Sequence, residues 1–369
     1  MQRIYLLLAV LTLTVLSISC KSQQGNELLL EVKQLDKSYE NLFVFYANLY
    51  DPVTGGFYDS PQKKTAPRIE STCRVISRID DNGLTNTVPD SLKQRWIRFL
   101  QSFQDAETGF FDDPNEHRNI DMRRGRALSY VKGAFRRLDV SSKYPYPSIK
   151  SNKDAEEDGL IHLKSVDNFN DWLNTLGWEE NPWKAGGTLS AQGNVIGSLE
   201  SPLQEQIVEA MFDFLATNQN ENGFWGGSSL YVQLSGAFKV STLYSIYDRQ
   251  MPNAKSILKS TLKCIREEEC INSTWVRNPL NLLAVIKPYV GISEKEKNEI
   301  IKISIDNVLQ FSRNDGGFAN SVKDEYGTTD GCSQAIITRN ALRDWVGLEP
   351  LIIPNTDSFL RTLGLAQKM

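Results

Sequence analysis

Residues 51–57 read Asp-Pro-Val-Thr-Gly-Gly-Phe, and this short pattern returns three more times along the chain. It reappears as Asp-Ala-Glu-Thr-Gly-Phe-Phe at 105–111, as Asn-Glu-Asn-Gly-Phe-Trp at 220–225 and as Asn-Asp-Gly-Gly-Phe at 314–318. Each copy closely follows an amphipathic segment of helical period. In each copy of the turn we expect glycine to end the helix in the left-handed conformation, Asp or Asn to form a hydrogen bond with the backbone of the turn, and the aromatic ring to cover the helix ends. Four copies at matching positions indicate one repeating unit.

The segments around these turns alternate between two kinds of helix. Residues 202–218 are apolar on one side, whereas residues 229–247 are apolar nearly all round and must be covered by other helices. Strand signals are absent. The alternation predicts an all-α protein with two layers, a single (α/α)6 toroid of six helical hairpins over 26–348. The expected helix pairs are 26–49 with 67–80, 88–104 with 123–138, 166–176 with 188–199, 202–218 with 229–248, 254–268 with 277–290, and 294–313 with 330–346.

The repeated turn resembles that of the terpenoid cyclase and protein prenyltransferase superfamily, the α/α toroids. Toroidal polysaccharide lyases use similar Asn-Gly-rich turns. The resemblance covers roughly residues 26–348 and implies the fold. Hairpins three and five depart from it, because they carry Asn-Pro-Trp-Lys-Ala-Gly-Gly at 181–187 and Asn-Ser-Thr-Trp at 272–275. The turn itself is interpreted as architectural.

Composition restricts the classes of function. The chain has 369 residues, of which 40% are hydrophobic, and 41 Lys+Arg stand against 45 Asp+Glu. A net charge of −4 argues against a nucleic-acid groove, since phosphate binding needs a basic field. The two histidines, His117 and His162, make a multi-histidine metal site unfavourable. We therefore expect no metal, no cofactor and no nucleic-acid partner.

The amino terminus has the pattern of an export signal. Met-Gln-Arg is followed by an apolar run over 4–18, which would span only about 22 Å as a helix. Ser19 then precedes Cys20, which resembles a bacterial lipoprotein signal in which the cysteine becomes the acylated first residue. Ser17 departs from that pattern, and a plain cleaved signal or an uncleaved anchor stays open. The expected organisation is a signal peptide at 1–19, a lipidated Cys20 and tether at 20–25, the toroid, and a C-terminal extension at 349–369. The protein would then be exported and held at a bacterial membrane by its lipid.

Two activities of the toroid superfamily are poorly matched. Asp330-Gly331-Cys332 resembles the Asp-x-Cys pair that holds zinc in prenyltransferases, but no histidine follows Cys332 to complete the site. Terpene cyclisation needs the Asp-x-Asp-Asp pattern, which is absent; Asp112-Asp113 is a bare pair. Prenyltransferase-like or cyclase-like activity is thus the least favoured interpretation.

The favoured interpretation is that the protein acts on or binds a carbohydrate. A glycosidase needs two carboxylates about 5–10 Å apart, and a lyase needs a base together with a group that neutralises the sugar carboxylate. We expect the site at the mouth where the inner helices begin, because helix amino ends favour anionic or hydroxyl-rich ligands. The expected catalytic residues are Asp113, His117 and Asp330, and the expected ligand-binding residues are Trp183, Trp225, Phe111, Tyr231 and Arg68. The alternatives are turn formation for Asp113, a solvated turn for His117 and core packing for the tryptophans. A non-catalytic glycan- or protein-binding lipoprotein is the rival interpretation.

Export also permits disulfides. Cys264 and Cys270 flank a short loop and are one candidate pair. Cys73 and Cys332 lie 259 positions apart, but both fall at the start of an inner helix, the first and the sixth. A closed ring would make those helices neighbours, so these two residues are a second candidate pair.

Overall fold

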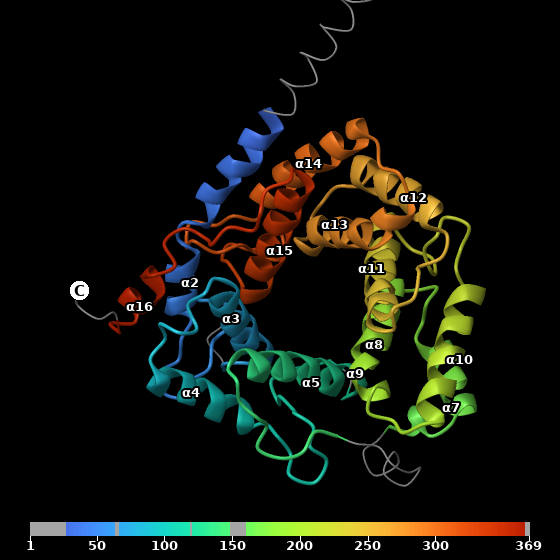
Figure 1. Cartoon of the computed structure of the whole chain (residues 1–369), viewed down its shortest axis with the longest axis horizontal. Helices are drawn as coiled ribbons and strands as arrows, with labels where there is room; N and C mark the ends of the chain where they lie inside the picture. The colour runs from blue at the N-terminus through green and yellow to red at the C-terminus, as the bar shows by residue number, and fades with distance from the viewer. Residues whose placement is uncertain (1–26, 63–65, 119, 148–159, 366–369) are drawn as a thin grey trace, which may run out of the picture.

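The computed structural model describes residues 27–62, 66–118, 120–147 and 160–365, and within these ranges it is helical, with isolated β-bridges and no strands. Figure 1 shows an inner ring of helices surrounded by an outer layer. The inner helices in the described ranges are α3 (Ile69–Asp81), α5 (Ile120–Arg137), α8 (Pro182–Ala191), α11 (Leu230–Ile246), α13 (Thr274–Ile286) and α15 (Thr329–Trp345). Each contacts the next, and α15 contacts α3. The ring is therefore closed, and the predicted α/α toroid is confirmed.

The outer layer follows the one-sided apolar pattern. Its helix α12 buries Ile257 and Leu262 against the inner layer, while Lys259 is exposed. The inner helix α11, by contrast, buries residues around its whole circumference. The outer helices are α2 (Leu42–Asn48), preceded by a helix at 27–35 and the 3-10 turn η1 (Asp36–Tyr39), then α4 (Asp90–Gln101), α7 (Val166–Thr175), α10 (Leu203–Thr217), α12 (Ala254–Glu267) and α14 (Glu294–Leu309).

The four repeated turns have one geometry. Each is closed by a single antiparallel bridge, between Tyr50 and Phe57, Gln104 and Phe111, Gln219 and Trp225, and Ser312 and Phe318. The glycine of each copy is left-handed, with φ between 73° and 86° at Gly55, Gly109, Gly223 and Gly316. At Gly316 an added Cβ would lie 2.7 Å from Asn41 Cβ, so a side chain is excluded there. The bridging aromatic of every copy is fully buried. These turns join the helices of the toroid, as the architectural interpretation predicted.

The two ends of the ring are joined by polar contacts. Arg74 of α3 forms an ion pair with Asp330 of α15 at 2.8 Å. The backbone N–H of Thr329 donates to Asp59 O at 2.8 Å, and the Tyr39 hydroxyl donates to Ala335 O at 2.8 Å. Segments that are about 270 residues apart in sequence, Asp59 and Thr329, therefore meet directly.

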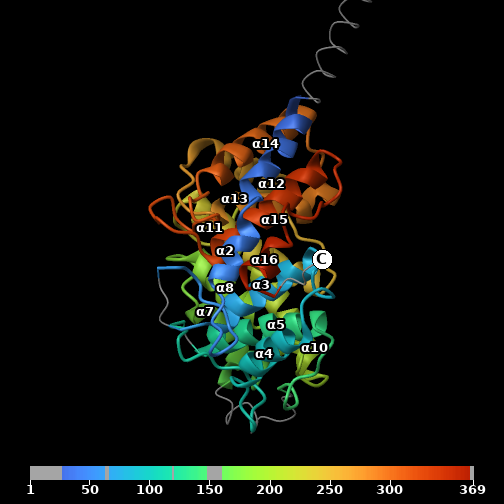
Figure 2. The same ribbon diagram turned by 90° about the vertical axis from the view of Figure 1, so that its left-hand side faces the viewer.

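The segment after α15 also packs on the toroid. It contains α16 (Ser358–Thr362), which lies against α2 (Figures 1 and 2). Phe359 of α16 is fully buried, with its ring centroid 6.3 Å from that of Phe57 and 6.5 Å from that of Trp96. The residues beyond 348 thus contribute to the core beside the first repeated turn.

Two expectations need correction. The third inner helix begins at Pro182 and not near 188, because Asn181 caps it by accepting a hydrogen bond from Lys184 N at 2.9 Å, and proline suits the first helical position. Neither candidate disulfide forms: Cys73, Cys264, Cys270 and Cys332 are buried free thiols. Cys332 instead accepts a hydrogen bond from Phe318 N through Sγ at 3.2 Å.

The expected signal, Cys20 and the tether lie outside the described residues. Across the described ranges, none of the helices combines the length and the apolar character that a membrane crossing requires.

Candidate functional site

A cavity of about 320 Å³ lies inside the ring, and all six inner helices of the described ranges contribute to its lining. Its volume is at the lower end of the range for small-molecule sites, roughly 300–1,000 Å³. Most of the lining comes from the amino-terminal halves of those helices, where the site was expected. Six cationic side chains line the cavity: Arg74, Arg118, Arg126, Lys184, Lys239 and Arg277. Among the described lining residues, one carboxylate is present, that of Asp330.

On one side of the cavity, made by α3, α5 and α15, the charges are paired. Glu70 is not among the described lining residues but accepts two hydrogen bonds from Arg126, which is: Nε donates to Oε1 at 2.7 Å and Nη2 to Oε2 at 2.9 Å. Arg74 joins the two carboxylates, since its Nη2 lies 3.1 Å from Glu70 Oε2 and 2.8 Å from Asp330 Oδ1. Gln334 Nε2 also donates to Asp330 at 2.8 Å. We call this set the paired wall.

The paired wall keeps its carboxylates ionised. Burial alone would raise the pKa of Glu70, but Arg126 and Arg74 outweigh it and hold that pKa well below its ordinary value. Burial opposes ionisation at Asp330 as well, where Arg74 and the Gln334 hydrogen bond lower the pKa. Both groups are therefore committed to arginines in the ligand-free protein.

On the other side, α11 and α13 present Lys239 and Arg277, which we call the unpaired wall. Neither side chain forms an ion pair with any described residue. Both lie near the Phe238 ring, with Lys239 Nζ 5.5 Å and Arg277 Cζ 4.3 Å from its centroid. Burial, reinforced by the positive charges of Arg126 and Arg277, lowers the pKa of Lys239 to about 7. Burial likewise lowers the pKa of Arg277 to about 10, although Tyr130 and Asp330 oppose that effect.

Aromatic and neutral polar groups complete the lining. Trp183 and Lys184 come from the first turn of α8, and Tyr130 accepts a hydrogen bond from Arg74 Nη2 at 3.3 Å. The amides and hydroxyl are those of Asn181, Thr274, Asn278 and Gln334. The cavity thus combines excess positive charge, hydrogen-bonding groups and one indole ring.

Of the residues predicted from the sequence, Asp330 and Trp183 line the cavity, and three predicted aromatics do not. Phe111, Trp225 and Tyr231 are fully buried in the core. Trp225 Nε1 donates to Leu215 O at 2.8 Å, and the Tyr231 ring stacks on Trp275 at 4.6 Å. These three rings present no face to a ligand, because they fill the space between helices.

Asp113, His117 and Arg68 do not line the cavity either. Asp113 is buried and caps the start of α3, accepting hydrogen bonds from Ile69 N and Asn115 N at 2.9 Å each. Arg68 donates to Asn115 O at 2.7 Å, and His117 is exposed. The predicted grouping of Asp113 and His117 with Asp330 in one cleft is therefore absent, since the segment around 113–117 serves to cap and anchor α3.

Four residues of the lining, Arg74, Arg126, Lys239 and Arg277, were not among those predicted from the sequence. A signal for them exists: Lys239 stands between Phe238 and Val240 in a helix that is otherwise apolar nearly all round. A charge in such a helix must face another polar group or the interior of the ring. The charge of Lys239 in this apolar helix is therefore a sequence signal for the cavity.

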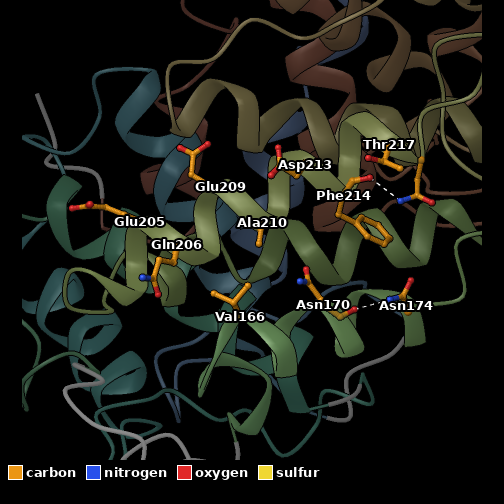
Figure 3. A pocket seen from close by; sticks show the side chains of 11 residues that line it. Val166, Asn170, Asn174, Glu205, Gln206, Glu209, Ala210, Asp213, Phe214 and Thr217 are labelled. Carbon is orange, nitrogen blue, oxygen red and sulfur yellow. Dashed lines mark hydrogen bonds between the residues drawn. The ribbon is translucent and has the colours of Figure 1, made fainter.

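A second hollow, of about 670 Å³, lies between the outer helices α7 and α10 (Figure 3). Glu205, Glu209 and Asp213 follow one another along α10 there, and all three are exposed. Glu209 is paired with Arg249 across the surface. This groove is a solvated face and brings no described cation or buried acid into a shared space.

The chemistry open to the central cavity follows from its charges. The described residues contain no group of three His, Cys, Asp or Glu side chains placed to hold a metal ion. Glu70 and Asp330 form ion pairs with arginines and stay ionised, so neither can act as the protonated acid of a glycosidase. The unpaired wall, in contrast, is suited to an anion, because its half-buried cations are less favourable without a partner than with one.

No family model and no curated protein matches this chain. Among solved structures, a variant of the type II terpene cyclase MstE from Scytonema in complex with merosterolic acid A is 12% identical, with a TM-score of 0.49 over 86% of this chain and 98% of that one. The GH76A α-1,6-mannanase from Salegentibacter sp. is 10% identical, with a TM-score of 0.45 over 84% of this chain and 99% of that one. An inactive variant of that mannanase, solved with α-1,6-mannotriose, is 11% identical with a TM-score of 0.45 over 84% and 99%. At these identities the likeness concerns the fold alone.

Proposed function

We propose that this protein binds an acidic saccharide in the central cavity of its toroid. The observation that carries the proposal is the unpaired wall, where Lys239 and Arg277 face the cavity without an ion-pair partner among the described residues. Arg277, whose pKa of about 10 keeps it charged at neutral pH, and the protonated form of Lys239 cost free energy in a confined space until an anion joins them. A ligand that brings carboxylate or sulfate groups supplies that anion.

A saccharide fits the remaining lining better than a bare inorganic ion does. Trp183 offers an aromatic surface for the face of a sugar ring, and the amides of Asn181, Asn278 and Gln334 offer hydrogen bonds to hydroxyl groups. Hydroxyl-rich ligands need such groups, whereas a phosphate or sulfate ion alone would leave them unused. An apolar polyprenyl chain suits this lining poorly, because charged side chains dominate it.

The binding proposal is tested by titrating the purified protein with acidic and neutral oligosaccharides of equal length in a calorimeter. We expect binding to acidic members, and a loss of about 10–100-fold in affinity for Arg277→Met, since a hydrogen bond to a charged group contributes about 1.5–3 kcal/mol. Lys259→Met is the matched control, because it removes one exposed positive charge from the outer helix α12. Binding of neutral oligosaccharides only, or equal losses in both variants, would contradict the proposal.

We also propose that the protein is exported and anchored through a lipid on Cys20. The support is the apolar run over 4–18, which ends in Ser19 before Cys20 and turns polar at once. Cys20→Ser should move the protein from the membrane fraction to the soluble fraction or block its processing. A mutant that stays with membranes and is processed normally would refute lipidation, and it would leave the saccharide proposal unaffected.

A further inference from the structure

We propose that Lys239 is the general base of a β-elimination in which the protein cleaves an acidic polysaccharide at a uronate residue, with Arg277 holding the sugar carboxylate. This inference rests on the proposed function, because it assumes that the acidic saccharide occupies the central cavity. It adds a reaction, a class of substrate and a role for two side chains.

The position of Lys239 supports that role. It lines the cavity from the inner helix α11, and no described carboxylate binds it. The charged and titratable groups that surround Lys239 come from all five of the remaining inner helices. They are Arg74 and Glu70 of α3, Arg126 and Tyr130 of α5, Lys184 of α8, Arg277 of α13 and Asp330 of α15. Cations outnumber carboxylates in this set, which favours the neutral amine.

The proton affinity of Lys239 suits a base that works near neutral pH. Its pKa is lowered to about 7, first by burial and then by Arg126 and Arg277. An ordinary lysine is almost fully protonated at that pH and accepts no proton. General bases work best when their pKa lies near the operating pH. Lys239 meets this condition without any further partner.

The reaction balances with the groups present. Arg277 pairs with the uronate carboxylate and makes the neighbouring C5–H more acidic. Neutral Lys239 Nζ takes the C5 proton, and the electron pair left at C5 forms the C4=C5 double bond. The bond from C4 to the glycosidic oxygen breaks, and that oxygen takes a proton from solvent and leaves as an alcohol. Lys239 returns its proton to solvent, so no oxidant, reductant or water addition is needed.

Substrate binding assists the transfer. Before binding, burial and the neighbouring cations favour the neutral form of Lys239. The incoming carboxylate adds a negative charge beside the amine and raises the pKa of Lys239. Above about pH 7 the amine of the free protein is mostly unprotonated, and the bound carboxylate then makes it a stronger proton acceptor.

The other ionisable groups are less suited to this step. Glu70 and Asp330 are held by arginines, so their pKa values lie below the ordinary range and they are weak bases. His117 is exposed and lies outside the described lining. The Tyr130 hydroxyl accepts a hydrogen bond from Arg74 at 3.3 Å and lies on the paired side.

The experiment measures elimination directly, through the ultraviolet absorbance of the new double bond conjugated with the carboxylate. Polygalacturonate, alginate, hyaluronan and heparin are incubated with the full chain, and binding of the same polymers is measured in parallel. We expect elimination of at least one polymer, with kcat/KM rising as pH increases through about 7, where free Lys239 loses its proton.

Two substitutions of Lys239 separate its role as a base from the effect of a positive charge at this position. Lys239→Arg places a permanently protonated group at this position, so we expect acidic polymers to bind no more than about threefold more weakly than to wild type, and a rate at least about 100-fold lower, the smaller end of general-base contributions. Lys239→Met should lose the rate as well, whereas the surface variant Lys259→Met should keep it. Thermal unfolding confirms that each variant is folded.

The outcomes distinguish the two proposals. If the wild-type protein binds an acidic polymer and eliminates none of them, the inference is overturned and the binding proposal stands. If Lys239→Arg keeps the wild-type rate, elimination occurs without Lys239 and the base assignment is overturned. If no acidic polymer binds, both proposals fail together.

Discussion

The two sides of the central cavity differ in how their charges are balanced. On the paired wall, Glu70 and Asp330 are each held by arginine at 2.7–3.1 Å, so the charges are satisfied before any ligand arrives. On the unpaired wall, Lys239 and Arg277 share a cavity with other cations, and burial lowers the pKa of both. Paired charges of this kind hold helices of the ring together, whereas unpaired ones reduce stability and imply a ligand. This difference is open to direct measurement.

The largest change in the free energy of unfolding is expected for a substitution in the paired wall. Glu70→Gln removes the carboxylate that binds Arg126 and Arg74 and leaves buried positive charge without its partner. We expect a loss of about 3–5 kcal/mol in the free energy of unfolding, the usual cost of breaking a buried pair. Urea denaturation measures it. Glu209→Gln, which breaks the exposed pair with Arg249, should cost less than about 1 kcal/mol. Equal losses in the two variants would mean that the paired wall adds no special stability.

On the unpaired wall, removing the charge of Lys239 should favour the folded state, whereas breaking the paired wall should disfavour it. The pKa of Lys239 is about 7 in the folded protein, whereas an unfolded lysine keeps its proton to about pH 10.4. Between these values the unfolded state binds more protons, so stability rises with pH across that window. We expect a gain on the order of 1–3 kcal/mol between pH 7 and pH 10, of which Lys239→Met should remove most. The measurement is urea denaturation of both proteins at several pH values; parallel pH profiles would refute the assignment of an unpaired Lys239.

Arg277→Met sharpens the comparison further, because it should separate stability from binding. Replacing a half-buried, unpaired cation by an apolar side chain of similar length should leave the ligand-free protein as stable as before, within about 1 kcal/mol, or more stable. Acidic-saccharide affinity should still fall by about 10–100-fold. Thermal unfolding and calorimetric titration of the same sample test both statements. A large loss of stability would place Arg277 among the structural charges.

The smallest effect is expected outside both walls. His117 is exposed and absent from the described cavity lining. His117→Ala should change neither the free energy of unfolding nor the saccharide affinity by more than about 0.5 kcal/mol. The same two measurements serve here. A loss of affinity comparable with that of Arg277→Met would move the site from the cavity to the segment around 113–117.

The fold was predictable because its signals are local. Gly316 and its counterparts need a left-handed backbone and are followed by an aromatic that closes the turn, and both features are readable within seven residues. The one misplaced inner-helix start, at Pro182, arose because a proline and two glycines were read as a turn, although proline suits the first position of a helix.

The candidate site was only partly predictable, for a physical reason. Asp330 and Trp183 were identified because they lie near helix starts, but so do Asp113 and Trp225, which cap and fill the structure instead. Residue type and position in the repeat do not show which face of an inner helix borders the interior of the ring. Lys239 lies in the tenth position of its helix, far from any turn, and its exposure to the cavity depends on how α8, α11 and α13 pack together.

The most direct test of the unpaired wall uses one ligand in two charge states. A galacturonate trisaccharide and its methyl ester differ in charge and little in shape, so calorimetric titration of the wild-type protein with both isolates the contribution of the anion. The unpaired wall predicts that the free acid binds at least about tenfold more tightly, corresponding to about 1.4 kcal/mol, and that Arg277→Met removes most of this difference. Equal affinity for the acid and the ester, or a preference that Arg277→Met leaves unchanged, would contradict the account.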